Sequence, residues 1–393
     1  MKPSNALASV RQLCCLGLPR ETLIAELLTA VQAVIPSSAN VFVGLGPDGL
    51  PSNVIPEFVI PEALEAYTAN LPGMHSPSIL KKIFDVFRTR RIMDDLPALW
   101  DNFYRSDKYN LTWRPYDQYY CLQALVHDER GPCGMLNLCR GRRSIPFSPE
   151  ETVLMERLLI YVEHGLQAPL STALHYADSG HSEMLILDTQ GTLLHASAAA
   201  RELLALACCS TYRVGTATPL TPLPELGQIC LNLRNIFQGR QASPPVVRQV
   251  NPRGRFIFRA YWLDPQSPAA GKLIGVTIKH QEPTVLQTWR AIRTCGLSPV
   301  QMEVCLLLAQ DYSQEAIGQR LNIKPTTVKD HVRKVYGKFG VSRRDELIAH
   351  LAVTAVPSRP PLATDRSAVG GYCGPRKSSI GLTDDWNRWT GIQ

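Results

Sequence analysis

Five basic side chains gather in one short segment, KPTTVKDHVRKVYGK, which spans residues 324–338. Five cations against one acid, Asp330, give it a net charge of +4, out of +7 for the whole chain. Lysine and arginine bind phosphate oxygens, and arginine also pairs with the edges of bases. The chemistry that this segment predicts is recognition of a polyanion. Taken alone, it also fits a second interpretation, an ordinary cationic face in contact with water.

A helix would divide this segment into two faces. At about 100° per residue, the face expected in the core holds Val328, His331, Val332, Val335 and Phe339. The opposite face holds Lys329, Asp330, Arg333 and Gly337. Thr326 and Thr327 stand at the N-terminus, where free N–H groups and the helix dipole attract a phosphate. Lys338 lies one helix length away, within reach of a second phosphate.

Helix-start and helix-stop signals surround the basic segment. Ser298-Pro299-Val300-Gln301 is a capping box with proline at the first helical position. We expect Ser313 to cap a second helix, and Gly340 to end the third in a left-handed conformation. A fourth helix follows. Four short helices within residues 290–352, with a tight turn between the second and third, predict a helix-turn-helix unit.

Residues 297–351 closely resemble the DNA-binding domain of LuxR-type (GerE-type) transcriptional regulators. Their sequence is LSPVQMEVCLLLAQDYSQEAIGQRLNIKPTTVKDHVRKVYGKFGVSRRDELIAHL. The resemblance rests on these residues: Leu297, Ser298, Glu303, Val304, Ser313, Ile317, Leu321, Thr327, Val328, Lys329, His331, Val332, Lys338, Gly340, Val341 and Arg343. It implies that the third helix enters the major groove of double-stranded DNA.

The resemblance also implies roles for single residues. Lys329, Asp330 and Arg333 would approach base edges. Three others would hold phosphates: Thr326, Thr327 and Lys338. The fourth helix makes the dimer contact in this family, which makes three residues candidates there: Leu347, Ile348 and Leu351.

Three positions depart from the family pattern. Asp311 stands where the family prefers glycine, and Ala316 replaces a common glutamate. Lys324 replaces the serine that usually caps the recognition helix, a loss of about 1 kcal/mol of local stability. These departures concern the turn and the cap.

The residues in front of this unit predict two more domains, both α+β. Residues 1–170 resemble a GAF-like sensory and dimerisation domain, through GPCGMLNLCRGRRSIPFSPEETVLMERLLIYVEHGLQ. Residues 180–282 resemble a PAS-like domain, through the hairpin and helix of MLILDTQGTLLHASAAARELLALA. The Pro-, Gly- and Ser-rich residues 357–393 are predicted to be a disordered tail. The expected fold class is α+β sensory domains followed by an all-α helix-turn-helix domain.

An aromatic cluster is the candidate ligand site of the front domain. Eight of the 21 residues from 100 to 120 are aromatic, in a chain with 7% aromatic residues. Five of them are candidates for lining an apolar pocket with polar groups: Trp100, Tyr104, Tyr109, Trp113 and Tyr116. A packed core and partner surface is the alternative, and the resemblance names no ligand.

Composition and absent motifs limit the other function classes. The chain has 393 residues, enough for two or three domains. Its eleven cysteines form no C-x-x-C pair and, with the histidines, no zinc spacing, so we expect no metal and no cofactor. The odd cysteine count and the lack of a signal peptide predict a reducing cytoplasmic compartment. No apolar window approaches about 18 residues, so no membrane span is expected.

The leading hypothesis is a transcriptional regulator that binds double-stranded DNA as a homodimer, with RNA polymerase as a further candidate partner. A promoter-recognition module of the sigma region-4 type is one alternative, but it needs a helical region upstream, where residues 180–282 predict strands. An enzyme is the other. The sequence has no phosphate-binding glycine loop, no G-x-S-x-G and no H-E-x-x-H, so no catalytic residue is predicted.

Overall fold

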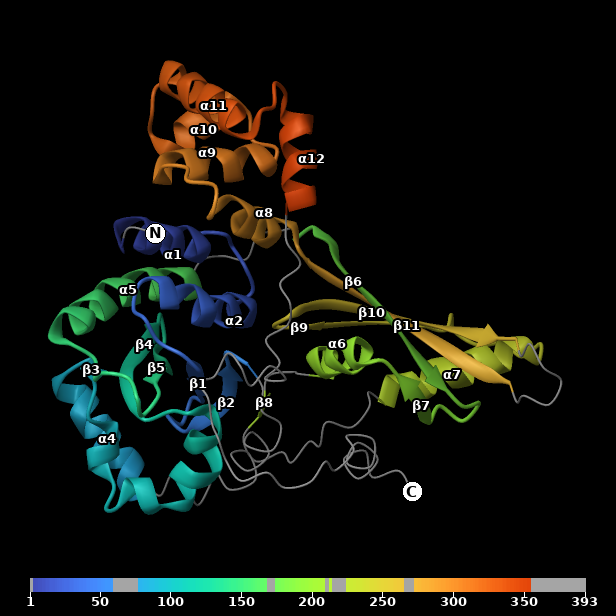
Figure 1. Cartoon of the computed structure of the whole chain (residues 1–393), viewed down its shortest axis with the longest axis horizontal. Helices are drawn as coiled ribbons and strands as arrows, with labels where there is room; N and C mark the ends of the chain where they lie inside the picture. Colours follow the sequence, from blue (N-terminus) through green and yellow to red (C-terminus); the bar gives the residue numbers. More distant parts are fainter. Residues whose placement is uncertain are drawn as a thin grey trace.

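The computed structural model describes residues 3–58, 77–167, 174–208, 212–213, 224–264 and 272–354. The chain folds into two antiparallel sheets with their covering helices, followed by a helical C-terminal part (Figure 1). This confirms the predicted fold class, which is α+β parts followed by an all-α unit. The predicted tail at 357–393 lies outside the described residues. No helix among the described residues is long and apolar enough to cross a membrane.

The front part is built on a six-stranded sheet in the order β3-β4-β5-β1-β2-β8. Its strands are β1 Val41–Leu45, β2 Pro51–Pro56, β3 Ile92–Met93, β4 Tyr120–Asp128, β5 Gly131–Arg140 and β8 Tyr212–Arg213. Because β8 comes from beyond residue 170, the sheet of the front part takes its edge strand from a later segment.

Alternating side chains give this sheet two buried faces. On β4, Leu122 and Ala124 face one core, and Cys121 and Leu125 face the other. The first core is covered by three helices: α1 Pro3–Cys14, α2 Arg20–Ala30 and α5 Pro149–Gln167. The second is covered by α4 Pro77–Thr89 and by short helical turns: Leu96–Leu99, Phe103–Arg105, Tyr109–Trp113 and Arg114–Tyr116. Another short turn, Val31–Ala33, extends α2.

Helix α5 begins with a capping box between Ser148 and Glu151. The backbone N–H of Glu151 donates to Ser148 Oγ at 3.4 Å, and Ser148 N–H donates to the Glu151 carboxylate at 2.9 Å. The carboxylate also pairs with Arg140 of β5, which fixes the helix on the sheet. Helix α1 was not predicted from the sequence.

The second part is a five-stranded antiparallel sheet in the order β7-β6-β11-β10-β9. Its strands are β6 Tyr176–Leu187, β7 Leu193–Ala196, β9 Val246–Asn251, β10 Gly254–Leu263 and β11 Leu273–Pro283. Helices α6 Ala198–Cys208 and α7 Pro224–Phe237 pack on one face of the sheet. Asp188 is a turn residue, and its carboxylate accepts from the N–H groups of Gln190 and Thr192. Strand β9 and helix α7 were missed.

The C-terminal part consists of α8 Thr284–Ile292, α9 Pro299–Ala309, α10 Gln314–Leu321, α11 Pro325–Phe339 and α12 Arg344–Thr354. Helix α8 leaves strand β11 directly and lies between the front part and the remaining helices (Figure 1). Its Trp289 is fully buried and donates from Nε1 to the carbonyl of Ser9 in α1 at 3.1 Å. The core of the C-terminal helices is therefore continuous with that of the front part.

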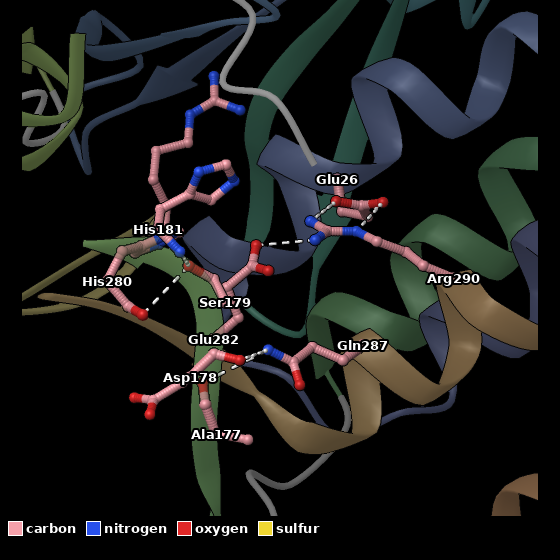
Figure 2. Close-up of polar contacts among 10 residues, drawn as sticks. Glu26, Ala177, Asp178, Ser179, His181, His280, Glu282, Gln287 and Arg290 are labelled. Carbon is pink, nitrogen blue, oxygen red and sulfur yellow. Dashed lines mark hydrogen bonds and ion pairs between the residues drawn. The ribbon is translucent and has the colours of Figure 1, made fainter. Parts of the chain in front are cut away.

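A buried ion cluster joins the three parts. Arg290 of α8 pairs with Glu26 of α2 at 2.5 Å and with Glu282 of β11 at 2.7 Å. Figure 2 shows the guanidinium lying between the two carboxylates. The exposed fraction of the side chain is 16% for Arg290, 11% for Glu26 and 6% for Glu282. Burial raises the pKa of Glu26, but the Arg290 charge outweighs it and holds that pKa below its ordinary value.

Candidate recognition helix and small-molecule pocket

Local capping fixes α9 and α10. The capping box of α9 is present in both directions, between Ser298 and Gln301. Ser313 caps α10 by accepting from the N–H of Ala316 at 3.1 Å. The turn that follows is tight, because a Cβ at Gly318 would lie 3.1 Å from the carbonyl oxygen of Ile323. A helix pair joined by so short a turn is the helix-turn-helix geometry that the sequence predicts.

Helix α11 packs through one face and leaves the other exposed. Val328, Val332 and Val335 are buried against α9 and α10, as predicted from the wheel. The helix ends at Gly340, whose φ of 65° is the expected left-handed conformation. At its start, Lys324 makes no side-chain cap, so the N-terminal N–H groups of the helix lack that partner.

The outward face of α11 carries the charges that the sequence placed there. Lys329, Asp330, Arg333 and Lys338 are all exposed, as is Thr326, while Thr327 is half-buried. Arg333 pairs with Asp330 at 3.1 Å, with 80% and 61% of the two side chains exposed. An ion pair this exposed contributes about 0–1 kcal/mol, so Arg333 can leave Asp330 at little cost. Helix α11 lies at the outer end of the molecule, away from α8 (Figure 1).

Helix α12 corrects two of the three predicted dimer-contact residues. Leu347 and Leu351 are 0% and 3% exposed and belong to the core shared with α8 and α9. In this structure they are not available to a partner. Ile348 is 41% exposed and is the one of the three that lies on the surface. All three residues lie on α12, but the side of the helix that carries Leu347 and Leu351 faces the core.

The turn before α10 accommodates one departure from the family pattern. Asp311 adopts φ of 70°, the conformation for which glycine is preferred, and its carboxylate pairs with Arg344 at 2.9 Å. Arg344 also donates to the carbonyl of Leu308 at the end of α9. The Asp311 carboxylate is 91% exposed, so its ion pair contributes little.

A pocket lies in the front part, between the sheet and the layer formed by α4 and the aromatic segment. Its cavity volume is about 80 Å³. Strands β1, β2, β4 and β5 supply one wall, including Val43, Val54 and Met135. Trp100, Trp113 and Tyr116 supply the other, together with Phe58. Three of the five aromatic residues predicted to line a pocket therefore do so.

The other two predicted pocket residues lie elsewhere. Tyr104 stacks on Tyr119 at 4.4 Å between ring centroids and lines a separate hollow with Trp100 and Phe103. Tyr109 packs edge-on against Tyr104 and does not line the cavity. Phe103 is 3% exposed and contacts Trp113 at 4.9 Å, so it belongs to the core. The aromatic segment thus contributes both to a pocket wall and to a packed core, the two interpretations that the sequence left open.

Polar groups that the sequence analysis missed also line the cavity. They are Asn40, Glu57, Lys108, Thr112, Gln118, Gln123 and Asn137. Burial raises the pKa of Glu57 to about 7 and lowers the pKa of Lys108 to about 7. Gln123 and Asn137 were detectable in principle, because each interrupts an apolar strand at a position whose neighbours predict burial.

The rim of the pocket is held by the second part of the chain. Arg253, in the turn between β9 and β10, donates to the carbonyl oxygens of Pro56 at 2.7 Å and Glu57 at 3.1 Å. The carbonyl of Arg253 is in turn 2.8 Å from Nε2 of His280 on β11. Two residues further along β11, Glu282 pairs with Arg290. A continuous chain of contacts therefore runs from the pocket rim to α8.

Fold and surface together define the C-terminal part as a helix-turn-helix domain. Residues 296–351 match the family described as "Bacterial regulatory proteins, luxR family", and this segment is a LuxR-type helix-turn-helix domain. The chain is 37% identical over 59 residues to the HTH-type transcriptional regulator MalT of Klebsiella pneumoniae and 36% identical to that of Cronobacter sakazakii. These matches cover 15% of this chain and 6% of each relative.

Solved structures of VqmA are also similar to this chain. A complex of Vibrio cholerae VqmA with ligand and DNA is 17% identical, covering 46% of this chain and 87% of that one, with a TM-score of 0.22. A phage VqmA–DPO complex is 20% identical over the same share of each chain, with a TM-score of 0.16. At these TM-scores the arrangement of those proteins is not transferred to this chain.

Proposed function

We propose that this chain is a transcriptional regulator that binds double-stranded DNA through α11 and senses a small molecule in its front part. The observation that carries the proposal is the outward face of α11, exposed and basic, on a LuxR-type helix-turn-helix domain. A helix of this kind fits the major groove, where arginine and lysine pair with base edges. An ordinary solvated helix explains neither the domain around it nor the concentration of charge.

Within this proposal, the residues of α11 divide into two groups. Lys329, Asp330 and Arg333 lie in the middle of the exposed face and read base edges. Phosphates are held at the two ends, by Thr326 and Thr327 with the N-terminal N–H groups and by Lys338. Since Lys324 does not occupy those N–H groups, they are open to an anion, and the Lys324 charge lies beside them.

The regulator acts as a homodimer in this proposal, because one helix-turn-helix module covers a single half-site. Two surfaces support it. Ile348 is exposed on α12, and Val153 and Ile160 are 47% and 63% exposed on α5, the long helix of the front part. Contact with RNA polymerase is a further proposal that no described surface singles out. The GAF-like and PAS-like assignments of the two front domains also remain predictions.

Ligand sensing is proposed from the pocket and from what its rim contacts. Occupation of the cavity would act on Pro56 and Glu57, which Arg253 holds. Through His280 and Glu282 the same contacts reach Arg290 and therefore α8, the helix that leads into the helix-turn-helix domain. A change at the rim would thereby alter how α11 is placed relative to the front part. The ligand can cause this change only if it binds one placement of the helices more tightly than the other.

The DNA part is tested by selection of binding sites from random duplexes with the full-length protein. Arg333→Ala should relax preference at particular base pairs and cost about 1–3 kcal/mol on the best site. Lys338→Ala should weaken all duplexes about equally and reduce the salt slope by about one. Lys82→Ala removes the same charge from α4 of the front part and serves as control, with wild-type binding expected.

Two results would contradict this assignment. Selection profiles that are identical for wild type and Arg333→Ala would remove Arg333 from the reading residues. Binding that is absent, or independent of salt for wild type, would remove the DNA-binding function itself. Sensing is tested separately. Native mass spectrometry of the purified chain should detect a co-purified small molecule, and this molecule should be lost when the chain is unfolded and refolded.

A further inference from the structure

The pocket wall presents a buried hydrogen-bond acceptor. Gln123 of β4 is 4% exposed and lies opposite Asn137 of β5. Asn137 Nδ2 donates to the carbonyl oxygens of Val41 at 3.3 Å and Met135 at 3.2 Å, so its Oδ1 faces Gln123. Gln123 must then donate its Nε2 to that oxygen, at 2.5 Å. This leaves Gln123 Oε1 buried, without a hydrogen-bond partner, at the wall of the cavity.

A buried carbonyl without a partner is unfavourable, and native proteins rarely retain one without a reason. A ligand that brings an N–H or O–H group to Gln123 Oε1 removes that penalty. The orientation of the amide is fixed by Asn137, whose own hydrogen bonds to the strand backbone do not allow the opposite arrangement. The wall therefore selects a donor, not an acceptor, at this point.

A cation lies elsewhere in the same wall. Among the described residues that line the cavity, Lys108 is the one cation and Glu57 the one carboxyl group. The Lys108 ammonium is 4.1 Å from the centroid of the Trp100 ring, and the residue is 6% exposed. With three N–H donors, an ammonium can bind a ligand acceptor in addition to its contacts within the protein. A buried cation is stabilised most by an anion.

The carboxyl group is already engaged by the protein. Glu57 Oε1 accepts from Gln32 Nε2 at 2.5 Å, and Oε2 accepts from the N–H of Asn40 at 3.0 Å. Both oxygens of Glu57 therefore already have donors within the protein, and a cationic ligand would compete with Gln32 and Asn40 for them.

The size and shape of the cavity limit the ligand to about one ring. One water needs about 10–15 Å³ of cavity, so the cavity of 80 Å³ takes the volume of roughly five to eight waters, which is the size of one ring with short substituents. Its flat walls are the aromatic rings of Trp100, Trp113 and Tyr116. Flat aromatic walls favour an aromatic ring in offset or edge-on contact.

We infer that the pocket binds a single-ring aromatic acid that carries a hydroxyl or amino group, with its carboxylate at Lys108 and its donor at Gln123 Oε1. This inference rests on the proposed sensing function and gives it a ligand class. Hydroxybenzoates and aminobenzoates have the required groups on one ring. Neutral phenols lack the anion, and benzoate lacks the donor.

The test measures the binding of a series of small molecules to the full-length protein. Binding is detected by thermal shift and by the fluorescence of the pocket tryptophans. The probes are the three hydroxybenzoate isomers, the aminobenzoates, benzoate, phenol and 4-hydroxybenzamide. The best hydroxybenzoate or aminobenzoate should bind about tenfold more tightly than benzoate and than phenol, the gain of one good hydrogen bond to a charged or buried group.

Two variants assign the contacts. Gln123→Met should abolish the preference for hydroxybenzoate over benzoate, and Lys108→Met should abolish the preference for hydroxybenzoate over phenol. Lys82→Met, an exposed lysine on α4, should change neither ratio. Because each readout is a ratio between two ligands on one variant, a general loss of stability does not imitate it. If a variant fails to fold, the wild-type series decides alone.

The outcomes separate this inference from the sensing function. If the neutral probes phenol or 4-hydroxybenzamide bind as tightly as the aromatic acids, the pocket senses a small molecule but the ligand class is wrong. If no probe of any class binds, and none displaces a co-purified compound, the inference and the sensing function both fail. Preferences that survive in both pocket variants would place the ligand elsewhere and overturn the inference.

Discussion

Removal of Arg290 tests whether the buried ion cluster holds the three parts of the chain together. In Arg290→Met, Glu26 and Glu282 lose the cation between them, while an unbranched apolar stem is kept. The two carboxylates are only 11% and 6% exposed, so water cannot replace the guanidinium. Breaking a buried pair in this way costs about 3–5 kcal/mol, a large share of the roughly 5–15 kcal/mol that holds a typical protein folded.

The pH dependence of this cost gives a sharper test. In the wild type, the pKa of Glu26 is held below its ordinary value, so the ionised carboxylate stabilises the folded state. This stabilisation is complete at pH values above the ordinary pKa, and it is lost as the pH falls through the lowered pKa of the folded protein. Without Arg290, burial is the largest remaining influence on Glu26 and raises its pKa against the charges of Arg293 and Arg253, so acid relieves the variant by protonating the carboxylate. The difference in the free energy of unfolding should therefore shrink between pH 8 and pH 5.

The measurement is urea unfolding followed by the fluorescence of Trp289 and the other tryptophans, with hydrogen exchange of the α8 amides. Arg11→Met is the matched control. Its ion pair with Glu303 also joins the front part to the C-terminal helices, but the side chains are 43% and 28% exposed, so about 0–1 kcal/mol is expected. A cost below about 1 kcal/mol for Arg290→Met, or one that does not shrink in acid, would refute the reasoning.

Three further predictions concern local features. Lys324→Ser should supply the missing cap of α11 and raise the stability of the isolated helix-turn-helix domain by about 0.5–1 kcal/mol, measured by thermal unfolding; no gain would mean that the N-terminus is already satisfied. At Asp311, with φ of 70°, stability should rank glycine above aspartate above alanine, with steps of about 1 kcal/mol, since the exposed pair with Arg344 offsets little; an alanine variant as stable as glycine would contradict this. Burial raises the pKa of Glu57 to about 7, so its stabilising effect is complete below the ordinary value of 4.5 and is lost as the pH rises through about 7. Between pH 5 and pH 8 the wild type should lose about 2–3 kcal/mol more than Glu57→Gln in chemical denaturation; equal losses would mean that Glu57 is solvated.

The sequence alone determined most of the helix-turn-helix domain. Its capping box at α9, its left-handed Gly340 and the apolar spacing of α11 all depend on residues within four positions of one another. Such interactions form in the same way whatever the rest of the chain does. For the same reason the sequence placed the exposed charges of α11 correctly.

Only the tertiary structure decided which apolar or polar residues meet across the chain. The family resemblance made Leu347 and Leu351 candidates for the dimer contact, but the sequence could not tell an internal core from a partner surface, since both require apolar residues at the same spacing. The sequence marked an aromatic segment, but the cavity also needs Gln123 of strand β4, and nothing in the sequence distinguished Lys108 within that segment as a lining residue. Likewise, Glu26 and Arg290 are 264 residues apart. Contacts of this kind are set by how sheets and helices pack, and one sequence without its fold does not record them.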